Sequence, residues 1–74
     1  METIFVCYQF DGDTLICVGT SDVREDIDVF AYTMSRKYDF DYIVYEKTYN
    51  SETDLYVENY LYDIYNGKVR LYQI

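Results

Sequence analysis

The sequence contains no histidine, no proline and no tryptophan, and only two cysteines among its 74 residues. Because histidine is the side chain most often used for proton transfer near neutral pH, its absence argues against an enzyme. Two cysteines are too few for the disulfide framework of a small secreted domain, so both thiols are expected to be reduced. No Cys/His cluster has zinc spacing, and Asp11-Gly12-Asp13 lacks the further ligands of a calcium loop. We therefore expect no catalytic residue, no cofactor and no bound metal.

Basic side chains are scarce as well, since six Lys and Arg stand against fourteen Asp and Glu, for a net charge of -8. Binding to nucleic acid or to an anionic membrane depends on Lys and Arg, so neither is expected. A basic protein partner is favoured instead. The chain shows no signal peptide and no apolar run near the roughly 18 residues of a membrane helix, which predicts a cytoplasmic location. No stretch rich in Pro, Gly or Ser marks a linker, so we expect one domain over residues 1–74.

One helix is predicted between Ser21 and Tyr38. Ser21 or Asp22 is the expected cap, with Glu25 completing a capping box after Asp22. Acidic residues fill the first turn and basic residues the last, as the helix dipole favours. The apolar residues that share one face at helical spacing are Val23, Ile27, Phe30, Ala31, Met34 and Tyr38. That face requires a sheet to cover it.

The segment before this helix predicts a β-hairpin. Two apolar runs, residues 4–10 and 14–18, flank Asp11-Gly12, a dipeptide typical of two-residue hairpin loops. With those two residues in the loop, Tyr8 pairs with Leu15, Val6 with Cys17, Cys7 with Ile16 and Phe5 with Val18. Both faces of the hairpin are then apolar, which suits central strands. The same register places the two thiols on opposite faces, where they cannot form a disulfide.

The segment after the helix predicts three strands. Residues 42–49 are rich in aromatic and β-branched side chains. Residues 55–65 fit a helix capped by Ser51, but Asn66-Gly67 is a strong hairpin signal and favours a strand followed by residues 68–74. That hairpin pairs Ile64 with Val69, Tyr62 with Leu71 and Asp63 with Arg70. The expected fold is α+β, an antiparallel sheet of about five strands in the order β-β-α-β-β-β with one helix on one face.

Carboxylates and tyrosines are the strongest functional signal. Few acidic residues have a nearby Lys or Arg, and an array of carboxylates can imitate the phosphates that a basic groove binds. Eleven tyrosines supply aromatic surface on which arginine stacks. The alternative is that the acidic residues only keep the surface soluble. The candidate partner-binding residues are Asp22, Glu25, Asp26, Asp28, Tyr32, Asp39 and Asp41.

In size, acidity, tyrosine content and expected layout, the chain resembles small phage-encoded inhibitors, among them anti-CRISPR and anti-restriction DNA mimics. No motif is shared residue by residue, so no site residue is carried over. The resemblance implies a non-enzymatic, stoichiometric inhibitor that occupies the basic nucleic-acid-binding site of a host defence or transcription protein, in the host cytoplasm. A second hypothesis is a structural protein that forms homodimers or larger assemblies through an open sheet face or an edge strand.

Overall fold

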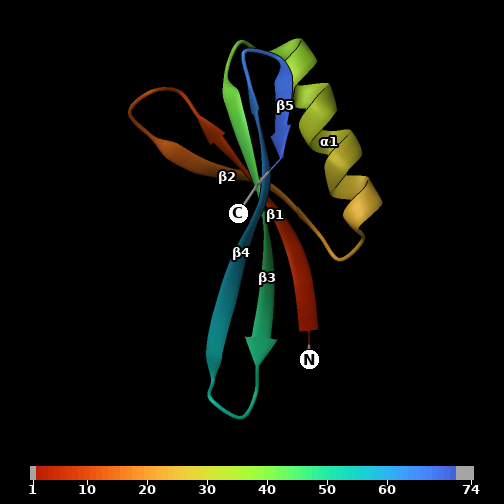
Figure 1. Ribbon diagram of the computed structural model, residues 1–74, viewed down its shortest axis with the longest axis vertical. Helices are drawn as coiled ribbons and strands as arrows, with labels where there is room; N and C mark the ends of the chain where they lie inside the picture. The colour runs from red at the N-terminus through yellow and green to blue at the C-terminus, as the bar shows by residue number, and fades with distance from the viewer. Residues whose placement is uncertain (1, 72–74) are drawn as a thin grey trace.

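The computed structural model describes residues 2–71, which form one antiparallel sheet and one helix (Figure 1). The sheet order is β2-β1-β3-β4-β5. The fold is therefore α+β with the predicted order β-β-α-β-β-β, although the predicted last strand extends into residues 72–74, which lie outside the described residues. The elements are β1 (Glu2–Phe10), β2 (Leu15–Ser21), α1 (Arg24–Lys37), β3 (Asp41–Asn50), β4 (Leu55–Tyr65) and β5 (Lys68–Leu71).

Helix α1 begins at Arg24, later than predicted. Ser21 is still paired with Phe5 in the sheet, so its backbone is not available to start a helix. The Ser21 hydroxyl instead accepts a hydrogen bond from the Val23 N–H at 3.0 Å. Val23 is the N-cap residue and has extended backbone with no side-chain cap. The predicted cap and capping box are therefore wrong, whereas the acidic first turn and the basic last turn are confirmed.

The core lies between α1 and the sheet. Two helix residues, Ile27 and Ala31, are fully buried, and Phe30 and Met34 are partly buried beside them. Val23 and Tyr38 of the predicted apolar face are exposed because they lie just outside the helix. The buried sheet residues that meet the helix are Cys7, Tyr42, Val44, Tyr62 and Ile64. The aromatic ring of Phe30 lies directly against Gly19, leaving no room there for a Cβ atom.

The first hairpin has a longer loop than predicted. The Asp11 side chain accepts hydrogen bonds from the N–H groups of Asp13 and Thr14, at 3.1 and 2.9 Å, and closes a four-residue turn. Tyr8 therefore pairs with Cys17, and Phe10 with Leu15, so the predicted register is wrong. The register shifts once more at Val18, which is an extra residue on β2. The thiols still lie on opposite faces, because Cys17 pairs with Tyr8, the strand neighbour of the buried Cys7, and both thiols are free.

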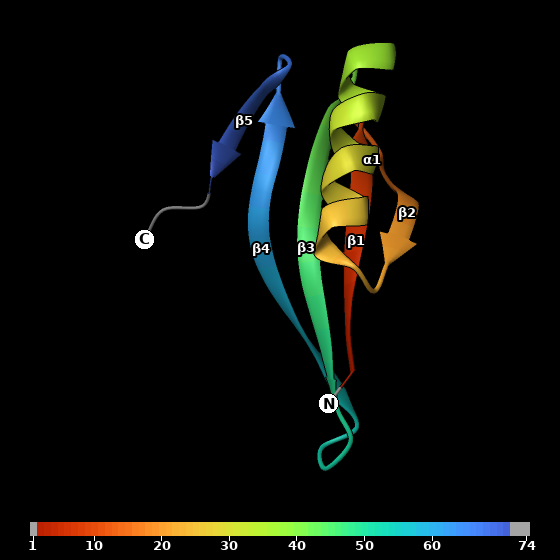
Figure 2. The same ribbon diagram turned by 90° about the vertical axis from the view of Figure 1, so that its right-hand side faces the viewer.

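Strand β2 is an edge strand, not a central one. Strand β1 pairs with β2 on one side and with β3 on the other, so β2 has no second neighbour in the described chain. Figure 2 shows β2 and β5 at the two outer edges of the sheet. The apolar side chains of β2 suggested a central position, but Leu15 and Ile16 are about half exposed, at 49% and 48%.

The second hairpin matches its prediction. Residues 55–65 form a strand, so the helical alternative for this segment is wrong. Asn66 and Gly67 both have positive φ, 52° and 74°, as a two-residue turn of this type requires. Ile64 pairs with Val69, Tyr62 with Leu71 and Asp63 with Arg70, in the predicted register.

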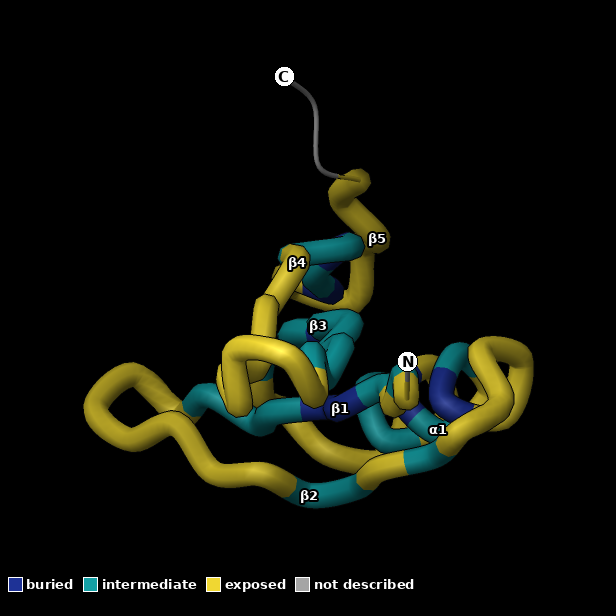
Figure 3. Tube along the Cα trace, turned by 90° about the horizontal axis from the view of Figure 1, so that it is seen from below, coloured by how far each residue is buried: buried dark blue, intermediate teal, exposed yellow. Residues whose placement is uncertain are grey.

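The helix covers only part of one sheet face. In Figure 2, α1 lies over β1 and β3, whereas β4 and β5 extend to one side of it. The lower halves of β1, β3 and β4 also continue beyond the helix (Figure 1). Seen along its length, the sheet is strongly twisted, and most of the exposed backbone belongs to the loops and to the edge strands (Figure 3). The uncovered surfaces are thus the groove beside α1, the opposite sheet face and the sheet edges.

Candidate protein-binding surface

The start of α1 carries three acidic side chains that form no ion pair among the described residues. Asp22 lies in the link that follows β2, and Glu25 and Asp26 lie in the first helical turn. All three are exposed. Their carboxylates stabilise the helix through its dipole, by about 0.3–1 kcal/mol each, and remain open to a partner. These three predicted site residues form one group at the N-terminal end of the helix.

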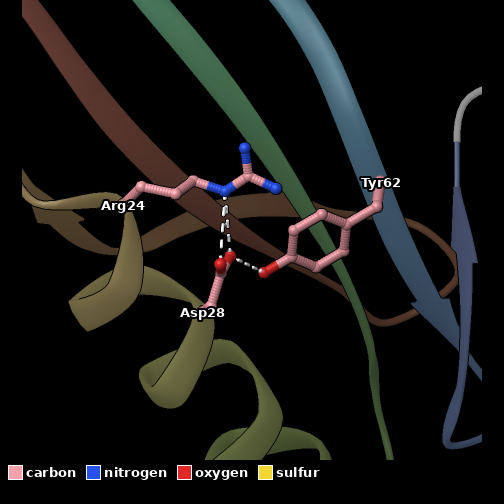
Figure 4. Close-up of polar contacts among 3 residues, drawn as sticks. All are labelled: Arg24, Asp28 and Tyr62. Carbon is pink, nitrogen blue, oxygen red and sulfur yellow. Dashed lines mark hydrogen bonds and ion pairs between the residues drawn. The ribbon is translucent and has the colours of Figure 1, made fainter.

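Asp28 makes polar contacts within the chain (Figure 4). Arg24 Nε lies 3.2 Å from both carboxylate oxygens of Asp28. The hydroxyl of Tyr62, on β4, donates to Asp28 Oδ1 at 2.5 Å. Burial of Tyr62 and the adjacent carboxylate both raise the pKa of its phenol. Asp28 therefore ties the helix to the sheet.

Tyr32 is half exposed, as predicted, and its ring already has a cationic neighbour. The Arg36 guanidinium lies 5.6 Å from the ring centroid. Together Arg24 and Arg36 make, inside the chain, the two arginine contacts that Asp28 and Tyr32 were predicted to offer a partner. Asp28 and Tyr32 also line an apolar groove of about 480 Å³ between α1 and the β4–β5 hairpin, whose other wall includes Val69 and Leu71.

Asp39 and Asp41 lie at the opposite end of α1. They border a small depression together with Asp11, from the β1–β2 loop, and Asn66. Asp41 Oδ1 accepts a weak hydrogen bond from the Asn66 N–H at 3.4 Å. The N–H groups of Thr14 and Asp13 lower the pKa of Asp11 and keep it charged. A helix of 14 residues spans about 21 Å, so these carboxylates form a second acidic group, well separated from the first.

The seven predicted residues thus do not form one patch. Asp22, Glu25 and Asp26 lie together at the start of α1, and Asp28 and Tyr32 follow them along the groove. The two remaining carboxylates lie at the far end of the helix. The structure adds Asp11 and Asp13 to the candidate set, because their loop lies at one end of β2 while Asp22 lies at the other. These two residues were not among the partner-binding residues predicted from the sequence.

A row of tyrosines crosses the sheet face opposite α1. Tyr8, Tyr45 and Tyr60 come from β1, β3 and β4, and successive ring centroids are 5.7 Å apart in edge-to-face contact. Each such pair contributes about 0.5–1.5 kcal/mol beyond its buried area. The Tyr8 hydroxyl and Glu58 raise the pKa of Lys47, which lies two residues after Tyr45 on β3. The row was missed because Tyr8 meets Tyr45 only through the β1–β3 pairing, and Tyr45 meets Tyr60 only in the β3–β4 register with its bulge.

The described chain has neither a metal-binding cluster nor a membrane-spanning helix. Residues 2–71 contain no group of three or more His, Cys, Asp or Glu side chains placed to hold a metal ion. No helix of the described chain is long and apolar enough to cross a membrane. No protein-family model, curated protein or solved structure matches the sequence. The candidate surface therefore has to be interpreted from its own charges and edges.

Proposed function

We propose that this protein is a non-enzymatic inhibitor that binds the basic nucleic-acid-binding site of a host defence or transcription protein. In this proposal the chain is phage-encoded and acts in the host cytoplasm. The observation that supports this proposal is that most of the acidic side chains have no ion-pair partner. Of fourteen acidic side chains, only Asp28, Glu58 and Asp63 form ion pairs within residues 2–71, and the other eleven do not.

The position of the unpaired carboxylates supports a protein partner. Seven of the eleven lie at the helix start, in the β1–β2 loop and at the helix exit, along the periphery of the sheet. Such a periphery attracts a positively charged groove from a distance and accelerates association at low salt. Two of the chain's three arginines do not neutralise it, because Arg24 and Arg70 are held by Asp28 and Asp63, at 3.2 and 2.7 Å.

The first experiment captures partners from a nuclease-treated bacterial lysate on the immobilised protein, with washes at low and then high salt. Nucleic-acid-binding proteins should be retained at low salt and displaced by added DNA or RNA. Retention of nothing above background, or of partners that ignore both salt and nucleic acid, would contradict the proposal.

A charge variant then tests the helix start with the purified partner. Asp22→Asn, Glu25→Gln and Asp26→Asn together remove three charges without touching Asp28, which bonds to Tyr62. If each exposed ion pair is worth about 0.2–1 kcal/mol, affinity should fall at least about threefold and become less sensitive to salt. The matched control, Glu2→Gln, Glu46→Gln and Glu52→Gln, removes the same charge elsewhere and should bind like the unaltered protein. If both variants lose the same affinity, the effect comes from net charge and not from the helix start.

Self-association is the second candidate, favoured by one feature. Strand β2 is an unpaired edge with no charged residue in its sequence, and such edges pair with one another. Sedimentation across a dilution series distinguishes the two functions. A stable oligomer that binds no other protein supports a structural role, and a monomer over the whole series contradicts it.

A further inference from the structure

We propose that the outer edge of β2 is the docking line for the partner, and that it takes an extended segment with an apolar centre and Lys or Arg at both ends. This inference rests on the proposed function, since it specifies how a basic protein would be held. It is based on three features: the difference between the two sheet edges, the charges beside β2 and the bulge within β2.

The two edges of the sheet differ in how they are protected. Edge strands are normally shortened or carry charged residues that prevent pairing. Strand β5 follows that rule through its charges, since its described residues include Lys68 and Arg70. Strand β2 has seven residues, LICVGTS, with no charge and no proline. Its outer side faces away from the rest of the described chain (Figure 2). The backbone N–H and C=O groups of β2 that point away from β1 are therefore open to pairing with another strand.

The charges at the ends of β2 determine which kind of strand can pair with it. Asp11 and Asp13 precede the strand, and Asp22 follows it directly. An antiparallel second copy centred on β2 would bring Asp13 of one chain beside Asp22 of the other, at both ends of the ladder. Like charges so placed destabilise a strand pair. A segment with Lys or Arg at each end meets the same carboxylates as opposite charges, so a basic partner is favoured over a second copy.

The bulge at Val18 limits the length of this ladder. It divides the edge into Leu15–Cys17 and the segment from Gly19 to Ser21, and a bulge turns the strand locally. The first part carries the exposed side chains of Leu15 and Ile16, at 49% and 48%, which supply apolar contact for alternate partner residues. A docked strand thus gains hydrogen bonds from the backbone and specificity from those side chains.

The test uses a synthetic peptide in which Thr-Val-Thr-Val-Thr is flanked by two lysines at each end, with binding followed by fluorescence anisotropy. A peptide with proline in place of the central Thr is the control, since it keeps the charge but cannot complete a ladder. Two variants of the protein are compared, Ile16→Lys on β2 and Val69→Lys on β5. Both positions lie on edge strands, are about half exposed (48% and 51%), and gain the same charge.

Docking on β2 predicts that Ile16→Lys binds the peptide about tenfold more weakly, whereas Val69→Lys stays within about twofold of the unaltered protein. The proline peptide should lose about tenfold as well. Bound peptide should also slow amide hydrogen exchange in β2 and leave exchange in β5 unchanged. This measurement uses the unaltered protein. Equal effects of the two lysines, equal binding of the two peptides, or protection confined to β5 or the α1 groove would overturn the inference.

The outcome is separable from that of the proposed function. If lysate capture retains no basic protein but the peptide protects β2, the inhibitor role fails and the docking edge stands. If a basic partner is captured and its binding is indifferent to Ile16→Lys, the edge fails and the inhibitor role stands. A dimer of the protein alone that Ile16→Lys dissociates would assign the edge to a second copy and overturn the partner proposed here.

Discussion

The hydrogen bond from Tyr62 to Asp28 allows a direct test of how α1 is attached to the sheet. Tyr62→Phe keeps the buried ring and removes only the hydroxyl, which lies 2.5 Å from the carboxylate. A hydrogen bond to a charged group contributes about 1.5–3 kcal/mol. The Asp28 side chain is 40% exposed, so water compensates in part. We expect the free energy of unfolding to fall by about 1–2 kcal/mol.

A substitution of the acceptor, Asp28, shows whether the loss of stability comes from the Tyr62–Asp28 hydrogen bond. Asp28→Ala removes the acceptor and also the ion pair with Arg24, which at this exposure is worth about 0.3–0.5 kcal/mol. Since the second change removes a bond that the first has already broken, the double variant should lose about 1–2 kcal/mol less than the sum of the single losses. Tyr32→Phe, on the exposed side of the same helix, is the control and should stay within about 0.5 kcal/mol.

Urea unfolding followed by far-ultraviolet circular dichroism measures these differences. For a domain of this size, 1 kcal/mol corresponds to about 4–8 °C in Tm, so the expected shift is also visible by heating. Two results would refute the reasoning. One is an unchanged unfolding midpoint for Tyr62→Phe, and the other is full additivity of the Tyr62 and Asp28 losses. In either case the helix would be held by its apolar face alone.

Three further predictions follow from the packing and from the shifted pKa values. Gly19→Ala should cost about 1–3 kcal/mol, because the new Cβ would lie 2.7 Å from the Phe30 ring, and Phe30→Leu should recover part of that loss; an equal loss in both backgrounds on urea unfolding would exclude the clash. Cys17 should react with a maleimide in the native protein, whereas Cys7, whose pKa burial raises to about 12, should react only after unfolding; mass spectrometry showing two adducts without urea would contradict this. Burial also raises the pKa of Tyr60 to about 12, so the folded state favours the neutral phenol. Its stabilisation is complete below about pH 10 and is lost as the pH rises through about 12. Urea midpoints that stay constant from about pH 9 to 12 would be inconsistent with that shift.

The parts of the fold that were predictable depend on residues near one another in the chain. The helical spacing of Ile27 and Ala31 identified the buried face of α1, and Asn66-Gly67 fixed the second hairpin and its register. The first hairpin failed at the same local level, because the Asp11 side chain closes a four-residue turn where a two-residue loop was expected. The helix cap failed because pairing with β1 keeps Ser21 in the sheet.

The candidate site was predictable only in part, since contacts between distant residues decide which side chains remain available. Nothing near Asp28 in the sequence indicates that Tyr62, 34 residues later, bonds to it. The edge position of β2 depends on β3 pairing with the far side of β1, which its apolar sequence does not reveal. The exposed carboxylates at the helix start needed no such contact, so their position followed from the helix pattern.

The central position of β1 has a consequence for the order in which the chain folds. The β1–β2, β3–β4 and β4–β5 ladders are all hairpins between consecutive strands, whereas the β1–β3 ladder joins Glu2 to Tyr49 and Phe10 to Asp41. Pairing across such sequence separations is the slow step in sheet proteins, and the absence of proline removes the other common source of slow phases. We therefore expect two hairpin units, β1–β2 and β3–β5, to form first, and their joining along β1 to limit the folding rate. During synthesis on the ribosome, the first hairpin must wait for β3 to emerge before its exposed side is covered.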